Sequence, residues 1–448
     1  MNLAKYQNIF FIGIGGIGMS ALARYFKSRD LNVAGYDKTP SAITKALENE
    51  GIPVHFTDGV SQISSDFKEI EKTLVVYTPA IPVGSEELNY FNQNGFDVFK
   101  RARVLAEIAN IGKSIAVGGT HGKTTTSSLI AHIFNQKSHK VSAFLGGIAK
   151  NFETNFIAGS SDIVVLEADE FDRSFHFLEP DIALITSMDA DHLDVYGTDE
   201  KIQEAFSDFA KRIKPNGKVV AKYGLPLEGI KYGLTPKADY SANDITIRDG
   251  RYHFTLATKD GQKASITTGL PGRHNVENAV GAAAACLEFG LPLPQVVSGI
   301  ESFTGVIRRF DLRVRNEKHI YIDDYAHHPE EISAFLKSVR EMYPGKKISA
   351  IFQPHLFTRT RDFISGFAES LALADELILL DIYPAREEAI PGVTSEWLLS
   401  IIELANKKLL TKKETLAWVT SAQPELLITI GAGDIDRLVE PITAILEA

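Results

Sequence analysis

The stretch Ser114-Ile115-Ala116-Val117-Gly118-Gly119-Thr120-His121-Gly122-Lys123-Thr124-Thr125-Thr126 decides the fold. Its apolar run predicts a buried strand, two glycines end that strand, and residues 127–134 are predicted to be helical. A strand, a Gly-rich turn and a helix N-terminus form a phosphate cradle, because backbone N–H groups and the helix dipole attract the anion. Lys123 is then placed to reach the terminal phosphates, and the Thr124 hydroxyl is placed for a phosphate-bound Mg²⁺.

This loop departs from the general pattern G-x-x-x-x-G-K-[ST]. The first glycine of that pattern would stand at Val117, but the nearest glycine is Gly118, so the loop is one residue short. The alternative interpretation is a Gly-rich turn that only caps a helix. The order of strand, glycines, Lys and Thr favours the phosphate loop.

A second glycine turn, Gly13-Ile14-Gly15-Gly16-Ile17-Gly18, follows a predicted strand at residues 9–12 and precedes a predicted helix at 19–28. It matches G-x-G-x-x-G in the position that a Rossmann-like unit requires. The next strand, residues 32–36, ends at Asp37, where a carboxylate can accept hydrogen bonds from ribose hydroxyls. The turn predicts a nucleoside diphosphate site without specifying NAD. Close packing of a helix on a strand is the alternative.

Composition limits the class of protein. The 448 residues predict about three domains. The formal net charge of −10 argues against a general binder of nucleic acid or membrane surfaces. The single cysteine, Cys286, excludes a disulfide scaffold and a cysteine zinc site, and it predicts a core thiol in a reducing compartment. Glycines interrupt the apolar start, and no run approaches the ~20 apolar residues of a membrane span, so we expect a cytoplasmic protein.

Polar side chains follow two predicted central strands. The strand at residues 163–166 ends in Glu167, Asp169 and Glu170. Ligands bind outside the carboxyl ends of strands in open α/β sheets, so Glu167 is predicted to hold Mg²⁺, whereas a solvated acidic loop is favoured for Glu170. The strand at 182–186 leads to His192, for which a metal or phosphate role is favoured over a structural one.

The second half of the chain adds further candidates. Residues 216–270 alternate and are rich in turns, which predicts a small antiparallel appendage with strands at 218–221, 245–248, 252–256 and 264–267. Asn275 and Asn278 are three apart and share a helix face, where they act either as ligands of adenine or phosphate or as simple caps. The paired Arg308 and Arg309 lie in a predicted hinge and suit phosphate clamping. Strands alternate with helices beyond it, so the last domain is also doubly wound.

Together these residues resemble the Mur ligase family, the ATP-dependent amide-forming enzymes of peptidoglycan precursor synthesis, over essentially the whole chain. The stretches that carry the resemblance are residues 11–20, 118–126, 167–170, 191–192, 274–279, 308–310, 323–329 and 353–355. The family's own loop is G-G-T-H-G-K-T, so the short spacing is its signature. Met19-Ser20 and the stretch Asp323-Asp324-Tyr325-Ala326-His327-His328-Pro329 are similar to the alanine-adding branch.

The resemblance implies an α/β fold of three domains. These are an N-terminal Rossmann-like UDP-sugar domain (1–107), a central P-loop ATPase-like domain with the small antiparallel appendage (108–307) and a C-terminal Rossmann-like domain for amino acid and nucleotide (308–448). It also implies an enzyme that uses ATP and Mg²⁺ to join L-alanine to the carboxylate of UDP-N-acetylmuramate through an acyl phosphate. We expect small-molecule substrates only, no nucleic-acid or membrane partner, and a cytoplasmic monomer or homodimer.

Residue roles follow from the resemblance. The catalytic residues would be Lys123, Glu167, His192 and Arg309. The ATP site would contain Gly118, Thr120, Gly122, Lys123, Thr124, Thr125, Asn275, Asn278, Arg309 and Asp324. The UDP-sugar site would contain Gly15, Gly16, Gly18, Met19, Ser20, Asp37 and Thr78. His355 and Arg359 would bind the alanine carboxylate, and Thr124, Glu167 and His192 would bind metal.

Two features differ from relatives within the family. The residues after Glu170 are Phe171-Asp172-Arg173-Ser174-Phe175, where the branch usually has Ser-Asp-x-Ser-Phe. The helix after His192 has lysine only near its ends, so we predict no carbamylated lysine. Three alternatives remain: a recycling ligase that attaches a preformed peptide, an NAD-dependent oxidoreductase and a non-catalytic nucleotide switch.

Overall fold

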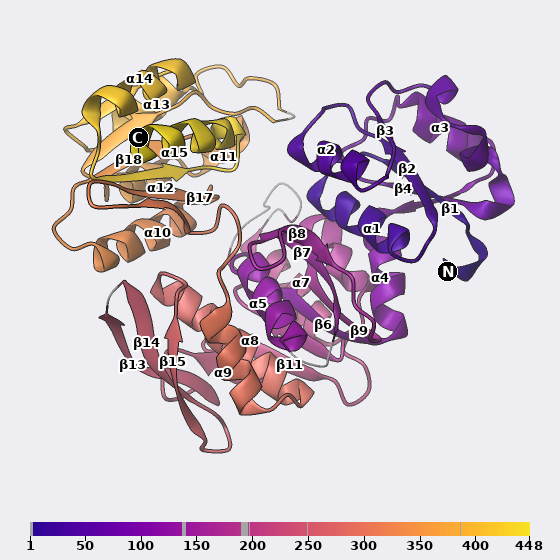
Figure 1. Cartoon of the computed structure of the whole chain (residues 1–448), viewed down its shortest axis with the longest axis horizontal. Coiled ribbons are helices and arrows are strands. Elements are labelled where there is room, and N and C mark those ends of the chain that lie inside the picture. The colour runs from indigo at the N-terminus through magenta and orange to yellow at the C-terminus, as the bar shows by residue number, and fades with distance from the viewer. Residues whose placement is uncertain (1–2, 137–139, 190–195, 197, 249, 386) are drawn as a thin grey trace. The chain divides into compact units, whose positions relative to one another are not determined.

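The computed structural model describes residues 3–136, 140–189, 196, 198–248, 250–385 and 387–448. The chain divides into two compact units. The first contains Met1–Asn243, Thr255–Ile266 and Glu277–Phe303, and the second contains Asp244–Phe254, Thr267–Val276 and Thr304–Ala448. Each contains parallel sheet covered by helices (Figure 1).

The first unit begins with a five-stranded parallel sheet in the order β3-β2-β1-β4-β5. Its strands are β1 (Asn8–Ile12), β2 (Asn32–Tyr36), β3 (Val54–His55), β4 (Thr73–Tyr77) and β5 (Asp97–Lys100). Its helices are α1 (Ile17–Lys27), α2 (Ala42–Asn49), α3 (Glu86–Gln93) and α4 (Arg101–Ile111), with short 3₁₀ turns η1 (Leu3–Lys5), η2 (Val60–Gln62), η3 (Ser65–Lys68) and η4 (Ile70–Lys72). The strand order reverses between β1 and β4, and the glycine turn follows β1 at this switch point, where doubly wound sheets bind ligands.

A ten-stranded sheet follows in the order β15-β14-β13-β12-β11-β10-β6-β9-β7-β8. Its strands are β6 (Lys113–Gly118), β7 (Ser142–Ala149), β8 (Thr154–Ile157), β9 (Ile163–Ala168), β10 (Ile182–Ile185), β11 (Lys218–Lys222), β12 (Ile230–Gly233), β13 (Tyr240–Arg248), β14 (Arg251–Ala257) and β15 (Lys263–Thr268). Its central strand β6 lies between β9 and β10 and is parallel to both. The phosphate loop therefore leaves the middle of the sheet, beside the carboxyl ends of both neighbours.

One strand expected in the appendage belongs to the central sheet instead. Residues 218–221 lie in β11, which pairs in parallel with β10, and β12 is parallel to β11. Val220 and Ala221 are fully buried, as expected for a strand that is covered on both faces. The expected appendage is therefore confined to β13, β14 and β15, which continue the sheet at its edge.

The second unit contains a six-stranded sheet in the order β16-β17-β21-β18-β19-β20, in which only β16 is antiparallel. The strands are β16 (Asp311–Arg315), β17 (Ile320–Asp324), β18 (Ile348–Phe352), β19 (Glu376–Leu379), β20 (Lys407–Leu409) and β21 (Leu426–Ile430). The helices are α10 (Pro329–Met342), α11 (Phe357–Asp362), α12 (Ile364–Leu371), α13 (Ser395–Ile401), α14 (Lys412–Ala422), α15 (Val439–Glu447) and the 3₁₀ turn η6 (Asp434–Leu438). Separate apolar clusters cover the two faces of the sheet, so it is doubly wound as predicted.

The remaining elements are α5 (Lys123–Asn135), η5 (Phe171–Phe177), α7 (Asp199–Ala210), α8 (Arg273–Phe289) and α9 (Leu293–Ser302). Cys286 is buried in α8, as the sequence predicts. Among the described residues, no helix combines the length and the apolar character needed to cross a bilayer. The predicted α/β fold class is confirmed.

Candidate active site

The phosphate loop connects β6 to α5 and depends on glycine at two positions. Gly119 has φ of +134° and Gly122, the N-cap of α5, has φ of +82°. Residues with a Cβ rarely adopt these conformations, and the turn needs both to aim its N–H groups at one point. A Cβ on Gly122 would also lie 2.7 Å from Oδ1 of Asn278, so this asparagine is packed against the loop.

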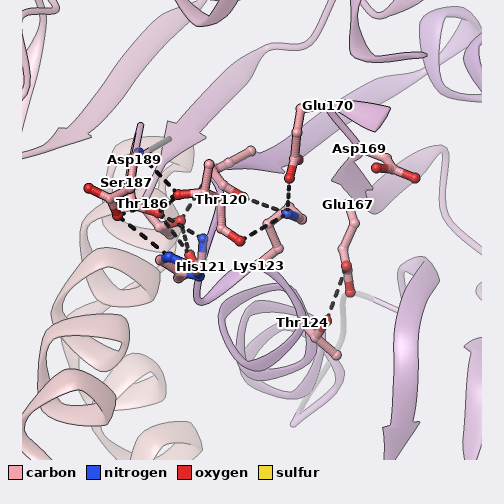
Figure 2. Close-up of polar contacts among 12 residues, drawn as sticks. Thr120, His121, Lys123, Thr124, Glu167, Asp169, Glu170, Thr186, Ser187 and Asp189 are labelled. Carbon is pink, nitrogen blue, oxygen red and sulfur yellow. Dashed lines mark hydrogen bonds and ion pairs between the residues drawn. The ribbon is translucent and has the colours of Figure 1, made fainter. Parts of the chain in front are cut away.

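Lys123 is the first residue of α5, and its ammonium group lies over the loop (Figure 2). Nζ donates hydrogen bonds to the carbonyl oxygen of Gly119 at 2.6 Å and to Oε1 of Glu170 at 2.8 Å. Burial lowers the pKa of Lys123, but the charges of Glu170, Asp169 and Glu167 outweigh burial and raise it above its usual value. The carboxylates around Lys123 therefore favour its charged ammonium form.

Glu167 at the carboxyl end of β9 faces the same loop. Its Oε2 accepts a hydrogen bond from the Thr124 hydroxyl at 3.2 Å, and its Oε1 accepts from the Ser127 hydroxyl at 3.2 Å and from the Gly146 N–H at 2.5 Å. A hydroxyl and a carboxylate at this separation are hard oxygen donors of the kind that Mg²⁺ prefers. These two predicted metal ligands are brought together.

Residues after β10 form the other side of the loop. The Ser187 hydroxyl accepts a hydrogen bond from the His121 N–H at 2.8 Å and is 2.8 Å from the Thr120 hydroxyl. The Asp189 N–H donates to the Thr120 hydroxyl at 3.2 Å, and the Asp189 carboxylate is 3.7 Å from Nε2 of His121. The strand end thus holds the loop in shape. His192, predicted to bind metal, lies outside the described residues.

The glycine turn after β1 is shaped by Asp37. Its Oδ2 accepts from the Gly15 N–H at 2.8 Å and its Oδ1 accepts from the Thr39 N–H at 3.0 Å. Gly16 is the N-cap of α1, and Gly18 lies in the first turn of that helix. The methyl group of Thr78 borders the turn, because a Cβ on Gly13 would lie 2.7 Å from it.

Two predicted UDP-sugar residues have side chains that face the protein interior. Met19 is 2% exposed and Ser20 is fully buried. The Ser20 hydroxyl donates to the Ile17 carbonyl at 3.0 Å and accepts from the Asn155 amide at 3.0 Å. In this structure the side chain of Ser20 therefore supports the first turn of α1.

The second unit contains the two arginines, and their side chains have different surroundings. Arg308 adopts φ of +62°, and its guanidinium group donates to Oδ2 of Asp323 at 3.1 Å and to the Gly431 carbonyl at 2.5 Å. Arg309 lies over the Tyr325 ring at 4.9 Å and 3.9 Å from Oε1 of Glu331. Arg308 is thus fixed inside its unit by a buried carboxylate, whereas Arg309 is held more loosely.

Asp324 is 9% exposed at the end of β17. It accepts from the Phe310 N–H at 2.6 Å and from the Ala326 N–H at 2.7 Å. Burial raises the pKa of Asp324 to about 6, against the opposing effect of Arg309. Asn275 also belongs to this unit, where its amide donates to the Pro271 carbonyl at 2.6 Å.

The two residues predicted to bind the alanine carboxylate, His355 and Arg359, both follow β18 in the chain. The ring of His355 stacks on Tyr383 with centroids 5.7 Å apart, and it meets His327 edge-on at 6.1 Å. Arg359 in α11 is close enough to His327 to help lower its pKa to about 4, although burial is the main cause.

Glu170 is the site residue that sequence reasoning missed. The solvated acidic loop favoured for it is wrong, since Glu170 is 1% exposed and is ion-paired with Lys123. Tyr196 also donates a hydrogen bond to the Glu170 carbonyl at 2.6 Å. One feature of the sequence indicated that Glu170 belongs to the site: it follows Glu167 and Asp169 at the end of the same strand.

Comparisons with known proteins identify the family of the chain. Three family models match in succession: Mur ligase family, catalytic domain (residues 8–112), Mur ligase middle domain (117–286), and Mur ligase, glutamate ligase domain (308–433). The chain is 48% identical over 446 residues to the UDP-N-acetylmuramate–L-alanine ligase of Flavobacterium johnsoniae, with 100% of this chain and 99% of that one covered.

Two solved structures share the fold over 98% of both chains. The UDP-N-acetylmuramate-alanine ligase of Thermotoga maritima is 26% identical, with a TM-score of 0.82. The murein peptide ligase of Psychrobacter arcticus is 21% identical, with a TM-score of 0.73, and shows the fold alone. The fold and the site define a nucleotide-binding α/β enzyme with a phosphate loop. The chain belongs to the Mur ligase family, whose members are ATP-dependent ligases.

Proposed function

We propose that the chain joins L-alanine to the carboxylate of UDP-N-acetylmuramate, with ATP cleaved to ADP and inorganic phosphate, in cytoplasmic peptidoglycan precursor synthesis. One observation carries this proposal: the ammonium of Lys123 and the Thr124–Glu167 pair share one phosphate loop, in a chain nearly half identical to ligases of that name. The domain ranges 1–107, 108–307 and 308–448 belong to the same proposal.

In the first unit we propose an ATP site on the phosphate loop, with Gly118, Thr120, Gly122, Lys123, Thr124, Thr125 and Asn278. Thr124, Glu167 and His192 would hold Mg²⁺, which supplies charge neutralisation and orientation of the phosphates when bound. The first two fit this ion by the chemistry of their oxygen donors.

For the sugar nucleotide we propose the turn of Gly15, Gly16 and Gly18, with Met19, Ser20, Asp37 and Thr78 around it. In the second unit we propose Asn275, Arg309 and Asp324 for the nucleotide, and His355 and Arg359 for the carboxylate of alanine. The resemblance supports these roles, and the fixed position of Arg308 favours Arg309 as the arginine that contacts phosphate.

The chemistry follows from the weakness of a carboxylate as an electrophile. The muramoyl carboxylate attacks the γ-phosphorus of ATP and ADP leaves, which forms an acyl phosphate. The neutral amine of alanine then attacks the acyl carbon, the tetrahedral intermediate expels inorganic phosphate, and the amide forms as the nitrogen loses its proton. Lys123 stabilises charge on the transferred phosphoryl group, and exclusion of water protects the acyl phosphate.

The test is phosphate release from ATP with Mg²⁺ and UDP-N-acetylmuramate, scanned over L-alanine, L-serine, glycine, D-glutamate and a preformed tripeptide. We expect release that requires both the sugar nucleotide and L-alanine. Release with the tripeptide but without response to alanine would instead place the chain among recycling ligases. The absence of release with every acceptor would contradict the proposal.

A further inference from the structure

The first turn of α1 is held by a side chain from the ten-stranded sheet. Asn155 in β8 is 1% exposed, and its amide donates to the Ile17 carbonyl at 2.5 Å and to the Ser20 hydroxyl at 3.0 Å. Ile17 and Ser20 flank the part of α1 that completes the glycine turn. A buried carboxamide is costly to place unless its groups are paired, and this one pairs with a single helical turn.

The remaining polar atom of Asn155 also faces α1. Its Oδ1 accepts a hydrogen bond from Arg24 at 2.5 Å. The Arg24 guanidinium in turn donates to both carboxylate oxygens of Glu50, at 2.8 to 3.0 Å. Both donors and the acceptor of Asn155 are therefore committed to the helix that follows the glycine turn.

Apolar packing reinforces this contact one turn further along α1. The Tyr25 ring lies 5.5 Å from the Phe144 ring of β7 and meets the Phe156 ring of β8 edge-on at 6.0 Å. Figure 1 shows α1 beside β7 and β8. The helix is thus fixed to this pair of strands by polar groups at its start and by aromatic rings at its end.

The same pair of strands also contacts the phosphate-loop site. The Gly146 N–H in β7 donates to Glu167 at 2.5 Å, and Glu167 pairs with Thr124. The strand β7 therefore contacts both the helix of the glycine turn and the carboxylate proposed for Mg²⁺, and its partner β8 contacts that helix as well. A sugar nucleotide that extends from the turn to the phosphate loop requires these two points to keep a fixed separation.

We propose that Asn155 is a positioning residue for the sugar nucleotide. Its amide holds the first turn of α1, and this turn positions the N–H groups that would bind the pyrophosphate. The distance from these N–H groups to Glu167 would then bring the muramoyl carboxylate to ATP. This role rests on the proposed function. This role predicts that replacing Asn155 weakens binding of the sugar nucleotide. Binding of ATP should be little changed, because ATP binds to the phosphate loop itself.

The experiment compares Asn155→Ala and Asn155→Asp with Thr154→Val as a matched control. The Asp variant keeps the size and the acceptor for Arg24 but loses both donors to α1. Thr154 is the neighbouring residue of β8, and its hydroxyl accepts a hydrogen bond from the Phe156 N–H within that strand. We expect both Asn155 variants to raise KM for UDP-N-acetylmuramate by about tenfold or more, and to leave KM for ATP within about twofold.

Calorimetry with UDP-N-acetylmuramate alone measures the binding step without turnover, and its Kd is expected to rise with KM. Hydrogen exchange gives a readout independent of activity. Amides of residues 16–24 should exchange faster in the Asn155 variants, while those of residues 123–135 should keep the wild-type rate.

The outcomes separate the two proposals. A wild-type enzyme that neither binds UDP-N-acetylmuramate nor releases phosphate would contradict the proposed function. An active wild type with an unchanged KM in Asn155→Asp would contradict the positioning role alone. A parallel rise of KM for both substrates would also overturn it, because that pattern indicates general loss of structure.

Discussion

The ammonium of Lys123 and the carboxylate of Glu170 form an ion pair of 2.8 Å in which the Glu170 side chain is only 2% exposed. Phosphate groups that bind the loop would compete with this carboxylate for the same cation. The pair therefore links the stability of the ligand-free protein to nucleotide binding.

Replacing Glu170 tests this link. Glu170→Gln removes the carboxylate charge that pairs with the buried Lys123, so we expect a loss of up to about 3 kcal/mol of unfolding free energy without nucleotide. Nucleotide phosphates would replace the lost partner, so MgATP should raise the Tm of the variant more than that of the wild type. Thermal unfolding with and without MgATP measures this, and equal shifts would contradict it.

Removing the cation itself should slow turnover severely. We expect Lys123→Ala to lower kcat by about 10²–10³-fold, because one charged group that stabilises the transferred phosphoryl is lost. Lys211→Ala serves as the control, since that side chain is 75% exposed and pairs with Asp208. Near-normal phosphate release by Lys123→Ala would argue against the assignment of the loop.

The metal role of Glu167 predicts a shift in the Mg²⁺ requirement. Glu167→Gln keeps the size of the side chain but removes its charge, so the Mg²⁺ concentration for half-maximal rate should rise by about tenfold. The exposed Glu179 provides the control substitution Glu179→Gln. A variant with an unchanged Mg²⁺ titration would place the metal elsewhere.

Gly122 combines a positive φ with close packing, and the two effects can be separated. Gly122→Ala should cost about 1–2 kcal/mol of backbone strain and also displace Asn278, which weakens ATP binding. Gly261 has a similar φ of +79° but open space where a Cβ would lie, so Gly261→Ala should show the strain alone. ATP titration of both variants measures the difference, and equal Kd values would show that the Asn278 contact is unimportant.

His132 in α5 gives the protein a specific loss of stability in acid. Burial lowers the pKa of His132 to about 4, so the folded state keeps a neutral ring while the unfolded state takes up a proton below about 6.5. The stability of the fold with a neutral His132 ring is fully present above about pH 6.5. As the pH falls towards 4, the free energy of unfolding decreases on this account by about 3 kcal/mol at most. His132→Gln should show a smaller difference between urea unfolding at pH 7 and at pH 5. An identical difference in both proteins would rule out His132 as a source.

The sequence predicts the parts of this fold that local pattern determines. Each of the two glycine turns, Gly13 to Gly18 and Gly118 to Thr126, is a continuous stretch of sequence. The strand before each turn and the helix after it could therefore be predicted, and the structure confirms these elements. Glu170 was misassigned because its burial depends on Lys123 and Tyr196, which lie far away in sequence. The strand β11 was placed in the appendage because the alternating pattern of residues 216–270 is typical of half-exposed strands, whereas β11 pairs in parallel with β10 inside the central sheet.

The two arginines show a further limit of sequence reasoning. Adjacent residues of one type carry no information about which points inward. The backbone of Arg308 adopts a positive φ, and its guanidinium donates to Asp323 and Gly431, whereas Arg309 lies near Glu331. Asp37 is similar, because its spacing predicted a ribose contact while the structure adds a bond to the Gly15 N–H.

The single cysteine makes this chain convenient for fluorescence work. Cys286 is fully buried and its thiol pKa is raised by burial, so maleimide reagents should leave it unmodified in the native protein. Two cysteines introduced at exposed positions, one in each unit, can then be labelled with a donor and an acceptor dye without removing the native residue. Energy transfer between the dyes would follow the separation of the two units in solution as ATP, UDP-N-acetylmuramate and L-alanine are added in turn.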